Sequence, residues 1–358
     1  MHLNILLWSF LLQTVTFSFF FSKPYLVVAV SSTFSAFQWP AYAAATTMLV
    51  PKQHLGRASG MVQFAEATSR LLSPMLAGVL VVTIQIQGVI LIDCVTFLFS
   101  LVMLLLVRFP EPKTTAEHEV KKSLQLREFI YGWTYITARP GLLGLLIFFA
   151  AINFLIGVVS VLVTPLVLAF ATVNVLGTVL SIGGSGMLVG GLVMSIWGGP
   201  KNRILGVFGF TLSGALSIIL AGLRPSVPVF FASAFIYYFG VSMINGCDQA
   251  IWQSKVAPAV QGRVFAVRSM LALVSLPLAY LIAGPLADRV FEPLLAPTGL
   301  LVGSIGKLIG VGRGYGIALL FIVVGILTVI ASAFGYLYQP LRRLNHQLPD
   351  AIADETLL

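Results

Sequence analysis

Four ionisable side chains interrupt long apolar stretches of this sequence: Glu66, Arg70, Asp93 and Asp248. In a membrane helix such a charge costs about 2.5–3.5 kcal/mol on insertion scales, so it usually faces the interior of a helical bundle. Glu66 and Arg70 are four residues apart and therefore share one helix face, where they can pair. A desolvated carboxylate beside one arginine can accept and release a proton, and we predict this chemistry for Glu66. The alternative is a static ion pair that only fixes packing.

Asp248 lies near one end of its apolar stretch and has two interpretations. It can contact a ligand, or it can pair with Arg263 or Arg268 a short distance along the chain. Asp93 is assigned a structural role, because it lies close to the end of a peripheral stretch. The polar and aromatic neighbours of Asp248 are predicted to line a pocket: Asn245, Gln249 and Trp252.

The sequence shows no catalytic or metal-binding pattern. Its four histidines do not have metal-ligand spacing, and no serine stands in a nucleophile motif. We therefore expect neither an enzyme nor a cofactor. The net charge of +9 comes without a basic stripe carrying interleaved aromatics, so nucleic acid is not an expected partner.

Composition places these residues in a membrane protein. The 358-residue chain is 58% hydrophobic and only 9% charged, whereas a soluble domain carries about 25% charged residues. A run of roughly 20 apolar residues crosses the hydrocarbon core as a helix. The sequence therefore predicts an all-α, polytopic membrane helical bundle. Ten spans are predicted, at residues 2–21, 24–48, 55–83, 86–107, 141–168, 174–197, 204–222, 227–252, 264–285 and 315–337.

The basic residues predict an orientation. If the loops around 49–57, 108–139, 198–203 and 253–268 and the tail face the cytoplasm, they hold 15 of the 21 lysines and arginines. This excess places both termini in the cytoplasm of a cell whose plasma (inner) membrane holds the chain. The predicted parts are a four-helix bundle at 1–107, a charged cytoplasmic linker at 108–139, a six-helix bundle at 140–337 and a tail at 338–358.

A faint repeat relates the two bundles. Residues 50–80 and 256–286 align without a gap, and both copies carry a Gly-Arg pair, Gly56-Arg57 and Gly262-Arg263. Each copy links the end of one apolar span to the start of the next. A two-fold repeat of membrane helices is the pattern expected of a transporter.

Short motifs make the chain resemble the macrolide-efflux branch of the major facilitator superfamily, whose members join two six-helix halves by a charged loop. The resemblance covers nearly the whole sequence and implies export of small amphipathic compounds in exchange for protons by alternating access. The stretches that carry it are 39–41 (WPA), 48–51 (MLVP), 198–203 (GGPKNR), 250–256 (AIWQSKV) and 261–264 (QGRV).

The resemblance also implies roles for individual residues. Trp39, in the first of those stretches, is a further pocket candidate. The loop at 198–203 has no acidic residue, which departs from the superfamily's usual loop. Basic residues in the loops are candidates for a gate: Arg57, Lys201, Arg203, Arg263 and Arg268.

The superfamily has two more helices before the first span predicted here. Subtracting the repeat offset of 206 from residues 198–203 places that missing loop upstream of Met1. We therefore expect a fold truncated to about ten helices, four plus six. The alternatives are a non-transporting remnant or a lysophospholipid-handling member of the same fold. The expected partners of a monomeric transporter are an amphipathic substrate, protons and membrane lipids.

Overall fold

A computed structural model describes residues 42–43, 46–47, 50–106, 125–223, 226–348 and 350–351, and every regular element within these ranges is helical. The all-α prediction is confirmed. The first two predicted spans, 2–21 and 24–48, lie outside the described residues except for the two short pieces before residue 50.

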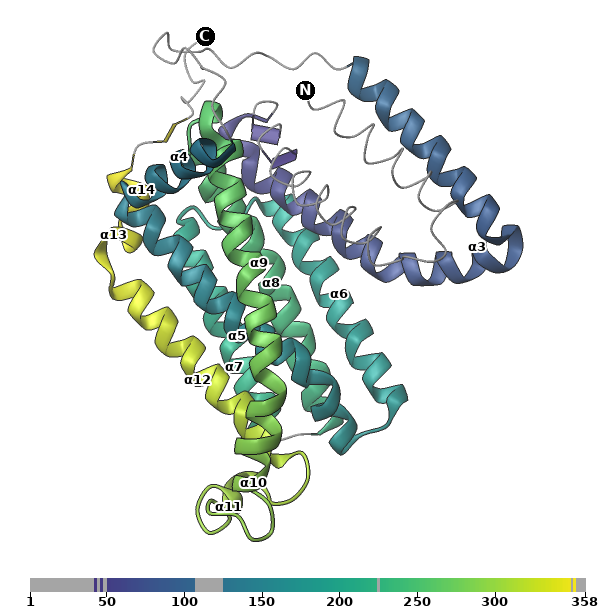
Figure 1. Ribbon diagram of the computed structural model, residues 1–358, viewed down its shortest axis with the longest axis vertical. Helices are drawn as coiled ribbons and strands as arrows, with labels where there is room; N and C mark the ends of the chain where they lie inside the picture. The colour runs from purple at the N-terminus through teal and green to yellow at the C-terminus, as the bar shows by residue number, and fades with distance from the viewer. Residues whose placement is uncertain are drawn as a thin grey trace.

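Six described helices are long and apolar enough to cross a membrane. They stand together as one bundle (Figure 1), and each begins and ends within three residues of a predicted span. Uninterrupted apolar sequence accounts for this agreement, because a helix satisfies its own backbone in lipid. The helices are α5 (Pro140–Phe170), α6 (Val173–Trp197), α7 (Arg203–Leu223), α8 (Val227–Lys255), α9 (Gln261–Leu286) and α12 (Tyr315–Leu337).

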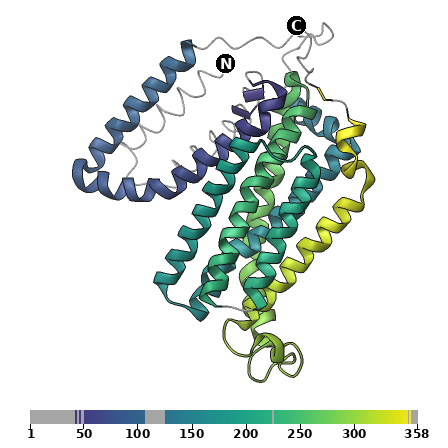
Figure 2. The same ribbon diagram turned by 180° about the vertical axis from the view of Figure 1, so that it is seen from behind.

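The spans predicted at 55–83 and 86–107 form one interrupted helix, α3 (Leu55–Leu106). Gln85 has φ 56° and ψ 177° and breaks the helical geometry between the two predicted spans. The chain turns sharply there, and the second arm folds back toward the end of the molecule where α3 begins, separate from the six-helix bundle (Figures 1 and 2). Only the first arm of α3 therefore contributes to the packing of the bundle.

The predicted linker 108–139 contains a helix that the sequence analysis did not expect, α4 (Gln125–Thr137). Ile136 is fully buried, and Gly132 lies so close to α9 that a Cβ on it would be 2.7 Å from the carbonyl oxygen of Arg263. The charges of the predicted linker concealed this short element, whose exposed residues within 130–137 outnumber its buried ones.

Glycines on α6 allow close packing against α8. A Cβ on Gly186 or Gly190 would lie 2.5 or 2.7 Å from the carbonyl oxygen of Phe235 or Phe239, respectively. The ring of Tyr238 lies over Gly183 in the same way. Small residues at such positions let two membrane helices approach closely.

The two ends of the bundle differ. At one end lie α4 and two short helices, α13 (Gln339–Arg342) and α14 (Leu344–Gln347). The other end carries α10 (Glu292–Leu294) and α11 (Gly306–Ile309), between α9 and α12 (Figure 1). The carboxylate of Glu292 accepts hydrogen bonds from the backbone N–H of Gly314 and Ile317, at 3.1 and 3.3 Å, and so caps the start of α12.

Candidate functional site

The first arm of α3 packs against α6 along a line of glycines. A Cβ on Gly191 would lie 2.7 Å from the backbone nitrogen of Phe64, and Gly60 meets the backbone of Met194 and Ser195 equally closely. At the end of the line, Gly56 contacts the carbonyl oxygen of Gly198. Backbone therefore meets backbone along this line, and the polar face of α3 is brought close to α8. We name this contact the glycine line.

Amide side chains gather where α3 meets α8. Gln63, Gln249 and Gln253 line a small cavity of about 20 Å³ together with Ser59. The Gln253 side chain donates a hydrogen bond to the carbonyl oxygen of Ala43, at 3.1 Å. Within the described ranges, the buried amide oxygens of Gln63 and Gln253 have no hydrogen-bond partner. Both are acceptors in need of a donor.

Asp248 and Arg268 form a buried ion pair beside these amides. Their side chains are 4% and 25% exposed, and Arg268 Nη2 lies 2.5 Å from Asp248 Oδ2. Arg268 also donates to Gln249 Oε1 at 2.9 Å, and its guanidinium lies 5.6 Å from the ring centroid of Trp252. Of the two predicted partners of Asp248, the structure pairs it with Arg268.

Glu66 and Arg70 form the ion pair that their spacing predicts. Arg70 Nη2 lies 2.7 Å from Glu66 Oε1, on the same face of α3 as Gln63. The side chains are 69% exposed for Arg70 and 37% for Glu66. The next residue, Leu71, packs onto Gly184 of α6. The pair thus adjoins the six-helix bundle and is not enclosed within it.

A second ionic cluster lies at the end of the bundle that carries α13 and α14. Asp350 pairs with Lys52, just before α3, at 2.7 Å and with Lys255, the last residue of α8, at 3.0 Å. Burial opposes the charge on Asp350, but hydrogen bonds from Lys52 and Lys255 outweigh it and hold the pKa of this carboxyl below its ordinary value. We name this cluster the Asp350 tie.

Further hydrogen bonds hold the tail in place. Lys255 Nζ donates to the carbonyl oxygens of Asn345 and Leu348, at 3.1 and 2.6 Å. The backbone N–H of Ala351 donates to the carbonyl oxygen of Ser254, at 2.9 Å. A polar cavity of about 460 Å³ lies beside the tail, bordered by the start of α3, the loop at 198–201 and the end of α8.

Comparison with known proteins identifies the family. Residues 2–279 match the model of the Major Facilitator Superfamily, which is well over half of the chain. The chain belongs to the Major Facilitator Superfamily. The resemblance seen in the sequence motifs is thereby confirmed, and the architecture is that of a multi-pass membrane transporter and not of an enzyme.

Individual relatives narrow the branch of the superfamily. Macrolide efflux protein A of Streptococcus pyogenes is 26% identical over 273 residues, which cover 74% of this chain and 66% of the relative. Its namesake in Enterococcus faecalis is 26% identical over 71% of this chain and 79% of its own length. An uncharacterized MFS-type transporter of Bacillus subtilis is 26% identical over 81% of this chain and 73% of its own. The chain thus spans just under two thirds of the Streptococcus relative.

The structure places the other predicted site residues of this superfamily member in different surroundings. Trp39 lies outside the described residues. Asn245 is exposed, whereas Trp252 is 1% exposed and packs in the core, so it lines none of the described cavities. The ring of Trp252 packs near Arg268 and among the surrounding helices, and its role as a pocket residue stays a prediction.

The predicted gate residues do not form one cluster. Arg57 and Lys201 are exposed and border the polar cavity, and Arg203 there donates to the carbonyl oxygen of Ala250 at 3.0 Å. Arg263 lies 5.2 Å from the ring of Tyr131 on α4, away from this cavity. Arg268 belongs to the ion pair with Asp248 described above.

Two groups of residues escaped the sequence analysis. The Asp350 tie joins residues from both ends of the described chain, and nothing local marks them as partners. The amides of Gln63 and Gln253 carry no charge, so the search for costly ionisable groups passed over them. A search for every polar residue inside an apolar span would have found Gln63, whereas Gln253 lies one residue beyond the predicted span 227–252.

Proposed function

We propose that this superfamily member exports small amphipathic compounds of the macrolide type in exchange for protons, by alternating access. The observation that carries the proposal is the Glu66–Arg70 ion pair on α3, at 2.7 Å, beside the contact with α8. Two of the relatives are named macrolide efflux proteins, which supports this substrate class.

In the proposed cycle Glu66 carries the proton. While its carboxylate is ionised, it holds the Arg70 guanidinium by a charge-assisted hydrogen bond. Protonation removes the negative charge, so the pair weakens and Arg70 becomes able to turn toward α8. Loss of the proton on the other side of the membrane restores the pair, and one proton has then crossed for each reversal.

Alternating access requires one part of the bundle to move against another. The glycine line is suited to this movement, since backbone meets backbone at Gly56, Gly60 and Gly191. The Asp350 tie closes one end of the contact between α3 and the six-helix bundle. That end is proposed to face the cytoplasm, because most of the lysines and arginines in loops lie on its side. Opening toward the cytoplasm then separates Lys52 from Asp350.

A transport assay tests the role of Glu66. Purified protein in proteoliposomes is given an imposed pH gradient, and uptake of a radiolabelled macrolide is measured with Glu66→Gln. We expect the gradient-driven component to disappear, because the amide cannot exchange a proton, while macrolide binding to the purified protein persists.

Asp93→Asn is the matched control. It neutralises another carboxylate of α3, on the arm beyond Gln85. This variant should retain gradient-driven uptake. Gradient-driven uptake by Glu66→Gln at the wild-type rate would refute the proposal.

A further inference from the structure

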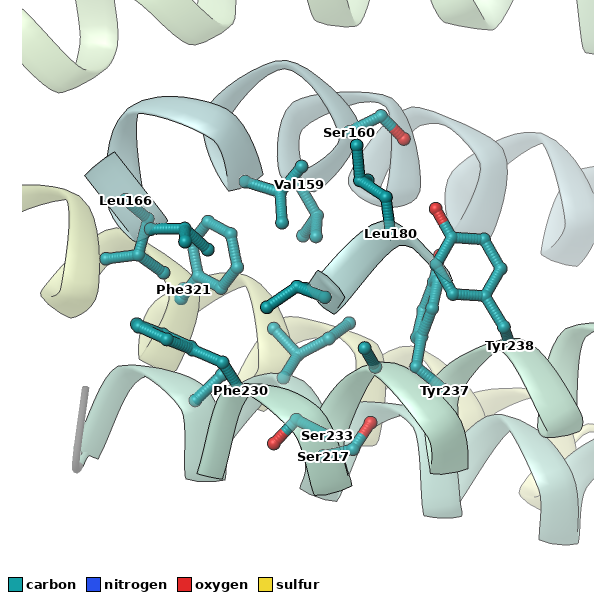
Figure 3. A pocket seen from close by; sticks show the side chains of 16 residues that line it. Val159, Ser160, Leu166, Leu180, Ser217, Phe230, Ser233, Tyr237, Tyr238 and Phe321 are labelled. Atoms are coloured by element: carbon teal, nitrogen blue, oxygen red, sulfur yellow. The ribbon is translucent and has the colours of Figure 1, made fainter. Parts of the chain in front are cut away.

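A cavity of about 70 Å³ lies inside the six-helix bundle, apart from the polar contacts of α3. Residues from α5, α6, α7, α8 and α12 surround it, and Figure 3 shows their side chains. Most of the wall is aliphatic or aromatic. The polar side chains that line it are Ser160, Ser217, Ser233, Tyr237 and Tyr238.

The cavity has an accessible end and a blind end. Ser160 is exposed and Leu180 is 48% exposed, while Leu166 and Phe230 are 1% and 3% exposed. Figure 3 shows Ser160, Leu180 and Tyr238 toward one side of the cavity and Leu166, Phe230 and Phe321 toward the other. A group that enters beside Leu180 would therefore end against a closed aromatic wall.

One hydroxyl in this wall has an unmet hydrogen-bonding requirement. Ser233 is 6% exposed, and its Oγ has no hydrogen-bond partner among the described residues. By contrast, Ser217 Oγ donates to the carbonyl oxygen of Gly214 at 2.8 Å. Most of the remaining wall is aliphatic or aromatic, so an apolar group fits this space better than a cluster of waters does. A ligand with one hydrogen-bonding atom satisfies Ser233 while its apolar part fills the remaining space.

The accessible end adjoins α3. Leu71 of α3 packs onto Gly184, one turn of α6 after Leu180. Leu71 directly follows Arg70 in the sequence of α3. A compound whose tip lies in the cavity would thus extend toward the Glu66–Arg70 pair.

We propose that this cavity binds a compact apolar group carrying one hydrogen-bonding atom, such as a single ring with a hydroxyl, at one end of the exported compound. That the bound compound is an exported one rests on the proposed function. The binding itself depends only on the cavity, so it can be measured without transport.

The test uses phenol and toluene, which share a ring and differ in the hydroxyl. Their binding to the full chain in lipid nanodiscs is followed by saturation-transfer NMR. Ala234→Phe fills the cavity, and Ala232→Phe adds the same ring at an exposed position two residues away on α8. Ser233→Ala removes the hydroxyl without adding volume.

Saturable phenol binding should fall at least about tenfold in Ala234→Phe and stay unchanged in Ala232→Phe. Ser233→Ala should weaken phenol by about two- to tenfold, the range of one hydrogen bond, and leave toluene unchanged. A radiolabelled macrolide should displace phenol from the wild type.

Equal phenol binding by the two phenylalanine variants would overturn the site, and failure of a macrolide to displace phenol would overturn its role in export. Neither result depends on the proton-gradient assay. Loss of proton coupling there would refute the proposed function while leaving phenol binding intact.

Discussion

At Asp248 a carboxylate and an arginine compensate for each other's burial. The Asp248 side chain is 4% exposed and that of Arg268 25%, so neither keeps full contact with water. Removing one partner of such a pair leaves the other charge uncompensated, at a cost of about 3–5 kcal/mol. Replacing both by apolar groups avoids that cost.

We therefore expect Asp248→Ala to lower the thermal unfolding midpoint in detergent clearly, and Asp248→Ala combined with Arg268→Met to recover much of the loss. Intrinsic fluorescence of the purified protein measures both. If the double variant is as unstable as the single one, the ion pair is not what stabilises this region.

The Asp350 tie predicts a pH dependence whose sign follows from its lowered pKa. Since the folded-state pKa lies below the ordinary value of about 3.9, the stabilisation is fully present above that value. It is lost as the pH falls through the lower, folded-state value. The partly exposed pair should contribute about 1 kcal/mol or less, because water screens it.

Unfolding midpoints of the wild type and Asp350→Asn, measured from pH 8 to pH 3, check this sign. The difference between them should be constant down to about pH 5 and shrink below about pH 4. A difference that vanishes between pH 7 and 6 would point to a histidine as the titrating group.

Individual residues were predictable where their partners lie close in sequence. Glu66 and Arg70 are one helical turn apart, so spacing predicted their pairing. For Asp248 the sequence offered Arg263 and Arg268 as possible partners, and the structure pairs it with Arg268. The Asp350 tie forms only because the start of α3, the end of α8 and the tail meet in the folded protein. The Gln63 oxygen, which has no partner among the described residues, depends on the surroundings in three dimensions, which no local pattern encodes.

Among the helices, predictability follows apolar length. The six membrane-length helices have long apolar runs and were found with accurate ends, whereas α4 is short, amphipathic and surrounded by charges. The break at Gln85 fell between two predicted spans because the apolar pattern pauses there. The direction of the second arm was not predictable, since it depends on the backbone angles of one residue.

Glycines of one helix should differ in their tolerance of alanine. On α6, a Cβ at Gly191 would meet the backbone of Phe64, whereas one at Gly177 would meet nothing within 4 Å. Overpacking costs about 1–3 kcal/mol, while alanine in an open helical position gains up to about 1 kcal/mol over glycine.

Gly191→Ala should accordingly lower the unfolding midpoint, and Gly177→Ala should leave it unchanged or raise it. Both substitutions add one methyl group to the same helix, so each is the control for the other. Equal unfolding midpoints for the two variants would show that the close contact between α3 and α6 at Gly191 does not contribute to the stability of the protein.

For the whole molecule, charge and structure together predict an orientation. The exposed Ser304 lies in the segment that carries α10 and α11, and the exposed Lys201 borders the polar cavity near the opposite end. The lysine and arginine excess assigns the Lys201 end to the cytoplasm.

In a chain whose Cys94 and Cys247 are serine, an impermeant thiol reagent should label Ser304→Cys in intact cells. It should reach Lys201→Cys only after permeabilisation. The reverse pattern would invert the orientation and assign the Asp350 tie to the outer face.

The glycine line also constrains how this protein can diverge. Most contacts between helices can exchange volume, since a larger side chain on one helix can be offset by a smaller one on its partner. At Gly60 and Gly191 the opposing atoms are backbone, which no substitution can shrink. A larger side chain at Gly60 or Gly191 therefore cannot be offset by a smaller side chain on the partner helix. Descendants of this gene should vary freely around the glycines while keeping the glycines themselves.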